Sequence, residues 1–447
     1  MPSSLHLPFA YRLVLIMLVT TASQMAVQLV TAQTASQINA HDRELAQRIL
    51  SQVHETLKHN YYDPSFHGVD IDARLSKYSA EIKSANTFQA AYRTIESFLI
   101  GLDDSHTIFI PPPNSNRVTY GFRIKMNGDQ CFVTGLRPNS DAAQKLRLGD
   151  QVLSLDGYTV NREDIWQIEY YLKFLPRRLA TDFTLRDNSG GVRKESVNAE
   201  LEALPARRPA SPSLSRMHLE TWQHNIRSRS AEQDDVFFWK FASFNEEEGG
   251  IEHMLGEARK HRALVLDLRD NSGGSQNNLV FVLGSLFNHD VTVGRAVTRE
   301  ETKPLAAKSR GRSAFTGQLV VLVDGRSASA SEILARVVQI EKRGVVIGDR
   351  SAGSVMAARF FPLSVGMGNG FDYGVQVTVA DLIMGDGKSL EHVGITPDEI
   401  LLPSADDLAT GRDPLLARAA ALVGAKLDAT SAGKLFPVEW PSAEPLR

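Results

Sequence analysis

The stretch VVLVDGRSASASE, residues 320–332, decides which fold this chain is expected to adopt. Four apolar residues precede Asp324, a Gly-Arg turn follows, and apolar residues recur at helical spacing from Ile333 onward. This pattern predicts a buried strand, a sharp turn and a helix that begins near the serines. A helix N-terminus offers free N–H groups and a positive dipole end, which favour developing negative charge. An acyl-transfer nucleophile needs such a place, although serine is also a common N-cap residue.

The bulk composition describes an ordinary globular protein with several domains. The chain has 447 residues, which is too many for one hydrophobic core, so two or three domains are expected. Hydrophobic residues make up 43% and charged residues 23% of the sequence. The net charge of −3 gives no reason to expect binding to nucleic acid or to an acidic membrane surface.

The N-terminus predicts export. Arg12 precedes the apolar run LVLIMLV, and Val30-Thr31-Ala32 suits signal peptidase, so residues 1–32 are predicted to be a signal peptide. The alternative is an uncleaved anchor, although the apolar run is short for a membrane span. Cys131 is the only cysteine, which excludes an intramolecular disulfide and gives no support for thiol catalysis or a cysteine-based zinc site. We expect an exported protein, periplasmic or secreted, that relies on core packing.

Periodicity divides the rest of the chain into four parts. Residues 40–115 are predicted to form an N-terminal helical domain, with Leu45, Ile49, Val53 and Leu57 at helical spacing. His106 falls on the connection between the last of these helices and an extended segment. Residues 118–204 contain short strands, residues 234–403 alternate strands and helices, and residues 404–447 form a partly helical tail. The alternation in 234–403 predicts a largely parallel sheet that binds ligands at the carboxyl ends of its strands.

Residues 118–204 resemble PDZ domains. The resemblance rests on the small-residue helix Ser140-Asp141-Ala142-Ala143, the turn Leu148-Gly149-Asp150 and a strand that ends in Asp156-Gly157. PDZ domains hold peptide C-termini by adding a strand at a sheet edge. The resemblance implies that Tyr120, Gly121 and Phe122 form the loop that would bind the peptide carboxylate. The alternative is a module of the same shape that holds no ligand. A Pro-rich connection at 205–212 is expected to end the module.

Three further stretches together resemble the tail-specific, or C-terminal processing, serine proteases. They are Leu266 to Gly274, Ser327 to Ile333 and Gly394 to Asp398. The similarity runs from about Tyr61 to Leu402. It implies a multidomain α/β protein with a ClpP/crotonase-like catalytic core. It also implies peptide or protein substrates, no metal or organic cofactor, and relatives that assemble into homo-oligomers.

The resemblance assigns the nucleophile and the oxyanion hole. The family's nucleophile is the middle serine of the triple, which is Ser329 here. The Ala330 N–H would face the oxyanion, and Gly273 and Gly274 would allow a second backbone N–H to approach it.

The sequence departs from the commonest family pattern at the general base. Processing proteases use a lysine 25 positions after the serine, and Ser354 stands there in this chain. A hydroxyl is too weak a proton acceptor to replace that amine. Relatives of the tricorn protease core form a second branch of the family, and the resemblance to them implies another base. It assigns His106 as the base and Glu391 as the orienting carboxylate, with the Ser105 hydroxyl partly relaying the orientation between them. An imidazole has a suitable pKa for this role, and the chain order of such groups varies freely.

Other assignments remain open at this stage. Lys388 is an alternative base, although it follows a surface turn, and His392 is expected to point away from Glu391 on a strand. Glu332 is expected to complement the helix N-terminus, and Asp267 and Asp270 to hold loops. The chief rival to a serine endopeptidase is a catalytically inactive peptide-binding scaffold of the same fold. Carriage of an apolar ligand has weaker support. It would be implied by the relatives of this protease family among the repeats of interphotoreceptor retinoid-binding protein.

Overall fold

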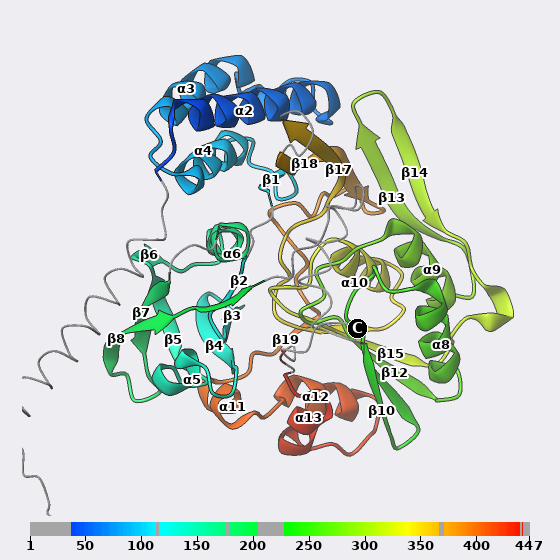
Figure 1. Cartoon of the computed structure of the whole chain (residues 1–447). Coiled ribbons are helices and arrows are strands. Elements are labelled where there is room, and N and C mark those ends of the chain that lie inside the picture. The colour runs from blue at the N-terminus through cyan, green and yellow to red at the C-terminus, as the bar shows by residue number, and fades with distance from the viewer. Residues whose placement is uncertain are drawn as a thin grey trace, which may run out of the picture.

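The computed structural model describes residues 37–112, 116–175, 179–203, 228–365, 371–438 and 440. The predicted signal peptide (1–32) and the predicted Pro-rich connection (205–212) lie outside these residues. Within the described ranges, no helix has the length and apolarity needed to cross a membrane. Figure 1 shows a group of helices at the top, a β-rich module at the lower left and an α/β region at the lower right.

A six-stranded sheet forms the middle of the α/β region, in the order β10-β11-β12-β15-β16-β19. All neighbouring strands from β11 to β19 are parallel, and β10 is antiparallel to β11. The strands are β10 (Arg229–Gln233), β11 (Val236–Lys240), β12 (Ala263–Asp267), β15 (Gln318–Val323), β16 (Val345–Gly348) and β19 (Glu399–Ile400). Strand β15 ends directly before Asp324, so the serine turn lies at the carboxyl edge of the sheet, where open α/β sheets bind ligands.

Alternate side chains of this sheet fill two cores, one on each face. Trp239, Leu266 and Val321 join the core under helices α8, α9 and α10. Phe238, Val265 and Leu322 join the core under helices α12 and α13, so these two helices cover one face of the sheet. The helices are α8 (Glu248–Ala258), α9 (Gln276–Leu286), α10 (Ala330–Ile340), α11 (Ala405–Thr410), α12 (Pro414–Leu422) and α13 (Ala429–Leu435).

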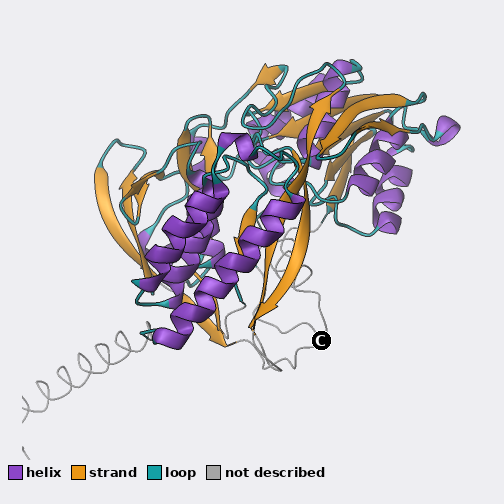
Figure 2. Cartoon of the chain, turned by 90° about the horizontal axis from the view of Figure 1, so that it is seen from above, coloured by secondary structure: helices purple, strands orange, loops and turns teal. Residues whose placement is uncertain are grey.

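The N-terminal helices pack on a second sheet, not only on one another. They are α2 (Ala40–Asn60), α3 (Ile71–Lys83) and α4 (Phe88–Ile100), and their core includes Phe109, Tyr373 and Val375. Figure 2 views the molecule from above and has helices in the foreground beside long strands. The strands of this sheet are β1 (Ile108–Ile110), β13 (Val291–Thr298), β14 (Thr302–Ala307), β17 (Met356–Val365) and β18 (Phe371–Met384). Strand β1 pairs with β18, and this pairing joins the segment that follows His106 to the C-terminal half of the chain.

The β-rich module has its own core. At one edge of its sheet, β3 has no strand beside its outer side among the described residues. Its strands run in the order β3-β4-β5-β7-β8, with β6 beside β5, so β3 lies at one end. Ile124, Val133, Val152 and Phe183 are among the residues of its core. The elements are β2 (Asn116–Thr119), β3 (Phe122–Asn127), β4 (Gln130–Leu136), α5 (Asp141–Lys145), β5 (Gln151–Leu155), β6 (Tyr158–Thr159), α6 (Ile165–Phe174), β7 (Ala180–Arg186), β8 (Val192–Asn198) and β9 (Glu200–Ala203). The domain boundaries drawn from the sequence stay predictions.

Candidate active site

Ser329 occupies a strained turn at the start of α10. It is the N-cap residue of the helix, with φ 54° and ψ −118°. A residue other than glycine at such angles costs of order 1–3 kcal/mol and persists only where its surroundings hold it. The Ser329 N–H donates to the Ser354 carbonyl at 2.8 Å and to the Glu332 carboxylate at 2.9 Å. Strain held by several partners is common where a side chain must be presented for chemistry.

Gly273 lies directly against the Ser329 turn. A Cβ at Gly273 would stand 2.8 Å from the Ala328 carbonyl oxygen, 2.8 Å from Ser329 Cβ and 2.9 Å from the Ala330 nitrogen. Its φ of +92° also favours glycine. Only a residue without a side chain allows the strand β12 loop to approach this close.

The N–H groups around Ser329 differ in their availability. The Gly273 N–H already donates to Asn271 Oδ1 at 2.9 Å. The N–H groups of Gly274 and Ala330 have no acceptor among the described residues. Of the predicted oxyanion donors, Gly274 and Ala330 are therefore the ones with a hydrogen to offer, while Gly273 supplies space.

His106 is held by its backbone on both sides. Its N–H donates to Asp104 Oδ1 at 2.8 Å, and its carbonyl accepts from Gln376 Nε2 at 2.9 Å. Its ring Nδ1 lies 2.8 Å from Ser105 Oγ. Burial lowers the pKa of the imidazole, and the nearby carboxylates of Glu391 and Asp104 oppose that shift. A lowered pKa keeps the ring neutral and able to accept a proton near pH 7.

Glu391 reaches His106 only through Ser105. One carboxylate oxygen, Oε1, accepts from the Ser105 N–H at 2.9 Å, and Oε2 accepts from the Val355 N–H at 2.7 Å. The Ser105 hydroxyl faces the ring, and the Ser105 backbone faces the carboxylate. The resemblance implied that the Ser105 hydroxyl partly relays the orientation of the ring; in the structure the hydroxyl contacts the ring and the backbone N–H contacts the carboxylate.

Ser354, at the position where the sequence resemblance leads one to expect a lysine, contacts both halves of the site. Its hydroxyl oxygen lies 2.9 Å from Ser105 Oγ and 3.4 Å from His106 Nδ1. Its carbonyl accepts from the Ser329 N–H. Ser329 and His106 are 223 positions apart in the chain, yet each contacts this one residue.

Glu332 does more than complement the helix N-terminus. Its buried carboxylate accepts from the Ser329, Gly353 and Ser354 N–H groups at 2.9, 2.8 and 3.0 Å, and from the Ser351 hydroxyl at 2.5 Å. Burial raises the pKa of Glu332 to about 7, against the effect of these donors. Glu332 therefore fastens the loop that carries Ser354 to the loop that carries Ser329.

The rival bases lie at the surface. Lys388 is exposed in the turn after β18, and its backbone N–H donates to Asp386. His392 is also exposed, and its Nε2 lies 2.9 Å from the Asp103 carbonyl oxygen. The expectation that His392 points away from Glu391 on a strand is wrong, because both residues lie in a turn. His392 has φ 59°, and its Nε2 is 3.7 Å from Glu391 Oε1.

The predicted carboxylate loop leads into the edge strand β3. Gly121 has φ +72°, and a Cβ there would lie 2.5 Å from Ser140 Cβ. Its carbonyl accepts from the Arg137 N–H at 2.8 Å. Phe122 begins β3. Two positions later the Ile124 carbonyl accepts a hydrogen bond from Arg326, so the loop before Ser329 already occupies one acceptor of this strand edge.

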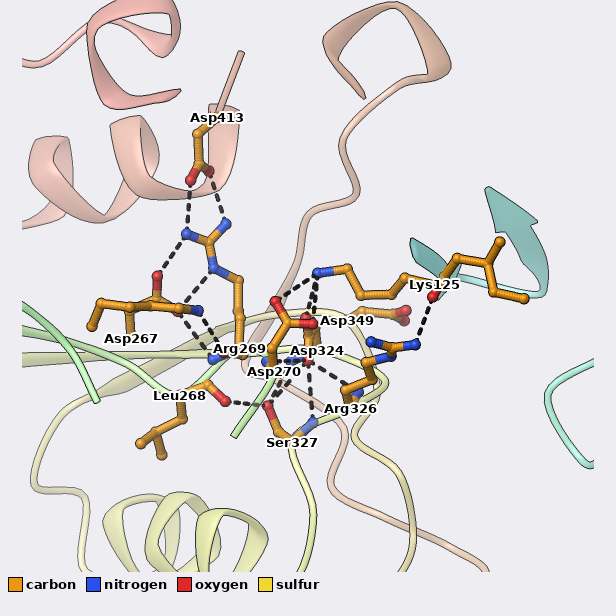
Figure 3. Close-up of polar contacts among 12 residues, drawn as sticks. Lys125, Asp267, Leu268, Arg269, Asp270, Asp324, Arg326, Ser327, Asp349 and Asp413 are labelled. Carbon is orange, nitrogen blue, oxygen red and sulfur yellow. Dashed lines mark hydrogen bonds and ion pairs between the residues drawn. The ribbon is translucent and has the colours of Figure 1, made fainter. Parts of the chain in front are cut away.

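Ion pairs connect β3 to the loops before Ser329. Lys125 Nζ lies 3.2 Å from Asp270 Oδ2 and 2.8 Å from Asp324 Oδ2 (Figure 3). Arg326, three positions before Ser329, pairs with Glu169 of α6. Burial alone would raise the pKa of Asp270, but Lys125 and other cations hold it well below its usual range.

A second ion-pair group lies at the end of β12. Arg269 bridges the buried Asp267 and the partly buried Asp413, with closest contacts of 2.7 Å to each (Figure 3). Burial would raise the pKa of Asp267, yet Arg269 and Lys240 lower it to about 2. The expectation that Asp267 and Asp270 hold loops agrees with these contacts.

Comparison with known proteins finds similarity to a family of peptidases. Residues 238–401 match the sequence profile of Peptidase family S41. The chain is 26% identical to the chloroplastic carboxyl-terminal-processing peptidase 2 of Arabidopsis thaliana, over 77% of this chain and 67% of that protein. It is 23% identical to the carboxyl-terminal-processing protease of Synechocystis sp., over 79% of this chain and 81% of that protein.

Solved structures share the fold. Mature CPAF, in a complex with lactacystin, has a TM-score of 0.60 and 14% identity, over 82% of this chain and 95% of that one. The photosystem II D1 C-terminal processing protease has a TM-score of 0.50 and 19% identity, over 82% of this chain and 94% of that one. These structures share the fold alone, whereas the sequence matches support a serine peptidase that is similar over residues 238–401 to Peptidase family S41 and over most of the chain to carboxyl-terminal-processing proteases.

Proposed function

We propose that the chain is an exported serine endopeptidase that cleaves peptide bonds through an acyl-enzyme on Ser329. The observation that carries this proposal is the position of Ser354, whose carbonyl contacts the Ser329 N–H and whose hydroxyl lies 3.4 Å from His106 Nδ1. Ser354 therefore lies between the turn that carries Ser329 and the ring of His106, which supports the assignment of these two residues as nucleophile and base.

His106 acts as general base and then as general acid. Its Nε2 takes the proton from the Ser329 hydroxyl as the oxygen attacks the carbonyl carbon, and returns it to the leaving amine. Its Nδ1 stays bonded to Ser105 Oγ, which fixes the plane of the ring. The Glu391 carboxylate, which is held by the Ser105 and Val355 N–H groups, favours the imidazolium that forms between the two proton transfers.

The N–H groups of Gly274 and Ala330 stabilise the oxyanion. Both are free of other acceptors in the described part of the chain; Ala330 directly follows Ser329, and Gly274 follows Gly273, which lies against the Ser329 turn. Donors fixed in advance toward developing charge contribute the largest part of catalysis in many acyl-transfer enzymes. The dipole of α10 acts in the same direction.

The substrates are proteins or peptides held near a C-terminus. The names of the sequence relatives, carboxyl-terminal-processing peptidase and protease, support this class. Residues 118–204 would hold the peptide at the start of the edge strand β3, beside Tyr120, Gly121 and Phe122 and before the Ile124 carbonyl that Arg326 occupies. The predicted signal peptide at 1–32 would deliver the enzyme outside the cytoplasm.

A fluorophosphonate probe tests the reaction. We expect it to label the wild type on the peptide that contains Ser329, as located by mass spectrometry, and to leave Ser329→Ala unlabelled. Peptide hydrolysis should be lost in Ser329→Ala and in His106→Ala. An unlabelled wild type without hydrolysis would favour the inactive peptide-binding scaffold, and labelling that survives Ser329→Ala would place the nucleophile elsewhere.

A further inference from the structure

The general base needs one particular tautomer of His106. To accept the Ser329 proton, Nε2 must offer a lone pair, so the ring hydrogen must lie on Nδ1. The Nδ1–H must then donate to an acceptor. Ser105 Oγ, 2.8 Å away, is the closest one in the described part of the chain. A hydroxyl, unlike a carboxylate, can equally donate to Nδ1 and so produce the wrong tautomer.

We propose that Ser354 is a positioning residue that selects the catalytic tautomer of His106 by accepting the hydrogen of the Ser105 hydroxyl. Either hydroxyl can donate across the 2.9 Å contact between Ser354 Oγ and Ser105 Oγ, and the catalytic tautomer requires Ser105 to be the donor. The proposal rests on the function proposed above. Ser105 Oγ has two hydrogen-bonding neighbours among the described residues, His106 Nδ1 at 2.8 Å and Ser354 Oγ at 2.9 Å. When the Ser105 hydrogen points to Ser354, an oxygen lone pair remains for Nδ1–H. When it points to Nδ1, the ring carries its hydrogen on Nε2 and cannot act as the base.

The surroundings fix Ser354 for this task. Its N–H donates to Glu332 Oε2 at 3.0 Å, and its carbonyl accepts from the Ser329 N–H at 2.8 Å. The next N–H, that of Val355, donates to Glu391 at 2.7 Å. These bonds hold in place the backbone from which the Ser354 hydroxyl reaches Ser105.

The size and charge of residue 354 also matter. Ser354 Oγ is already 3.4 Å from Nδ1, so the longer side chain of a lysine in this place would crowd the imidazole and add a positive charge to the cluster. A cation there would disfavour the imidazolium that forms during proton transfer. A neutral hydroxyl accepts the Ser105 hydrogen without that repulsion. The loss of the family's lysine and the use of His106 are thus linked changes at one site.

Ser354→Thr and Ser354→Val form a matched pair, because the two side chains have nearly the same shape and differ in the hydroxyl. We expect Ser354→Thr to keep kcat within about threefold of the wild type. Ser354→Val should lower kcat by about 10–100-fold with little change in KM, as loss of an outer-shell partner typically does. Histidine-selective ¹⁵N NMR should find the His106 hydrogen on Nδ1 in the wild type and in Ser354→Thr, and on Nε2 in Ser354→Val. The spectrum of His106→Gln identifies the signal.

The outcomes separate this inference from the proposed function. If the wild type labels on Ser329 and hydrolyses peptides while Ser354→Val keeps its kcat and the Nδ1 hydrogen, the role of Ser354 is overturned and the peptidase stands. If the wild type neither labels nor hydrolyses, the proposed function fails and takes the inference with it. Equal losses in Ser354→Thr and Ser354→Val, with an unchanged tautomer, would mean that residue 354 serves only packing, which also overturns the inference.

Discussion

Two polar clusters flank the Ser329 turn, and they are built on opposite principles. The hydroxyl cluster (Ser105, His106, Ser354, Glu391 and Glu332) joins the ring to the turn through neutral hydroxyls and N–H groups. The ion-pair cluster (Lys125, Asp270, Asp324, Arg326 and Glu169) joins the turn to the β-rich module through charge.

The pKa shifts of the two clusters differ accordingly. In the hydroxyl cluster, burial raises the pKa of Glu332 to about 7 and lowers the pKa of His106, so burial favours the neutral form of both groups. In the ion-pair cluster, burial is outweighed by opposite charges, which lower the pKa of Asp270 and raise that of Lys125. Proton transfer needs groups poised to change charge, whereas a rigid support needs groups that never do. The comparison agrees with the proposed proton transfer in the hydroxyl cluster and with a structural, supporting role for the ion-pair cluster.

The largest expected effect comes from removing the nucleophile and the base. Ser329→Ala and His106→Ala should each lower kcat/KM by about 10⁴-fold or more, and the double variant should be little worse than either single variant, because the two groups act as one unit. Initial rates of peptide hydrolysis measure this. Independent, multiplicative losses would show that the two residues do not work together.

Next in size is the cost of breaking a buried ion pair. Arg269→Ala should lower the free energy of unfolding by about 3–5 kcal/mol, because it leaves the buried Asp267 carboxylate short of its main partner. Arg418→Ala is the matched control, since Arg418 pairs with Glu399 at the exposed surface. Urea unfolding should separate the two variants, with Arg418→Ala close to the wild type. Equal stability of both variants would contradict a supporting role for the buried pairs.

Gly273→Ala tests the close approach at the turn. The added Cβ would crowd Ser329 and Ala330, so kcat should fall by about 10²–10³-fold, the cost of a lost oxyanion donor. Gly190→Ala is the control, because Gly190 has a similar φ of +90° but no atom within 4 Å of the added Cβ. Similar losses of activity in both variants would trace the effect to backbone strain alone.

Glu96 should make stability fall as pH rises. Burial raises its pKa from 4.5 to about 8, although its Oε2 accepts the Phe109 N–H. Between these values the folded state holds a proton that the unfolded state releases, so the free energy of unfolding should decline by up to about 1.4 kcal/mol per pH unit. Urea unfolding from pH 5 to 8 should decline less steeply in Glu96→Gln. A wild type and a variant with parallel pH profiles would remove Glu96 from the account.

The smallest effect is expected at Lys388. Because this lysine is exposed in a turn, Lys388→Ala should hydrolyse peptides at nearly the wild-type rate. A loss as large as that of His106→Ala would make Lys388 the base after all.

Local sequence patterns predicted much of the architecture. The apolar run before Asp324 is β15, the serines lead into α10, and the helical spacing from Leu45 marks α2. The long hairpin of β13 and β14 was missed. Strand β13 finds its place by pairing with β18, and such distant pairing leaves no local signal.

For the candidate site, the sequence could indicate the residue types but not the hydrogen bonds that connect them. Motif context pointed to Ser329, His106, Ser105 and Glu391, but the bond from Glu391 to Ser105 runs through a backbone N–H, which any residue could supply. The position of Ser354 beside Ser105 likewise depends on main-chain bonds to Glu332 and Ser329. The positive φ of Ser329 gave no sequence signal either, because glycine and not serine is the usual residue at such angles.

The central claim is that the His106 ring is the base that activates Ser329, and chemical rescue tests it most directly. Peptide hydrolysis by His106→Gly is measured with and without added imidazole. The account predicts negligible turnover without imidazole, turnover that rises with the concentration of neutral imidazole, and no rescue in Ser329→Ala. Wild-type turnover by His106→Gly in the absence of imidazole would contradict it.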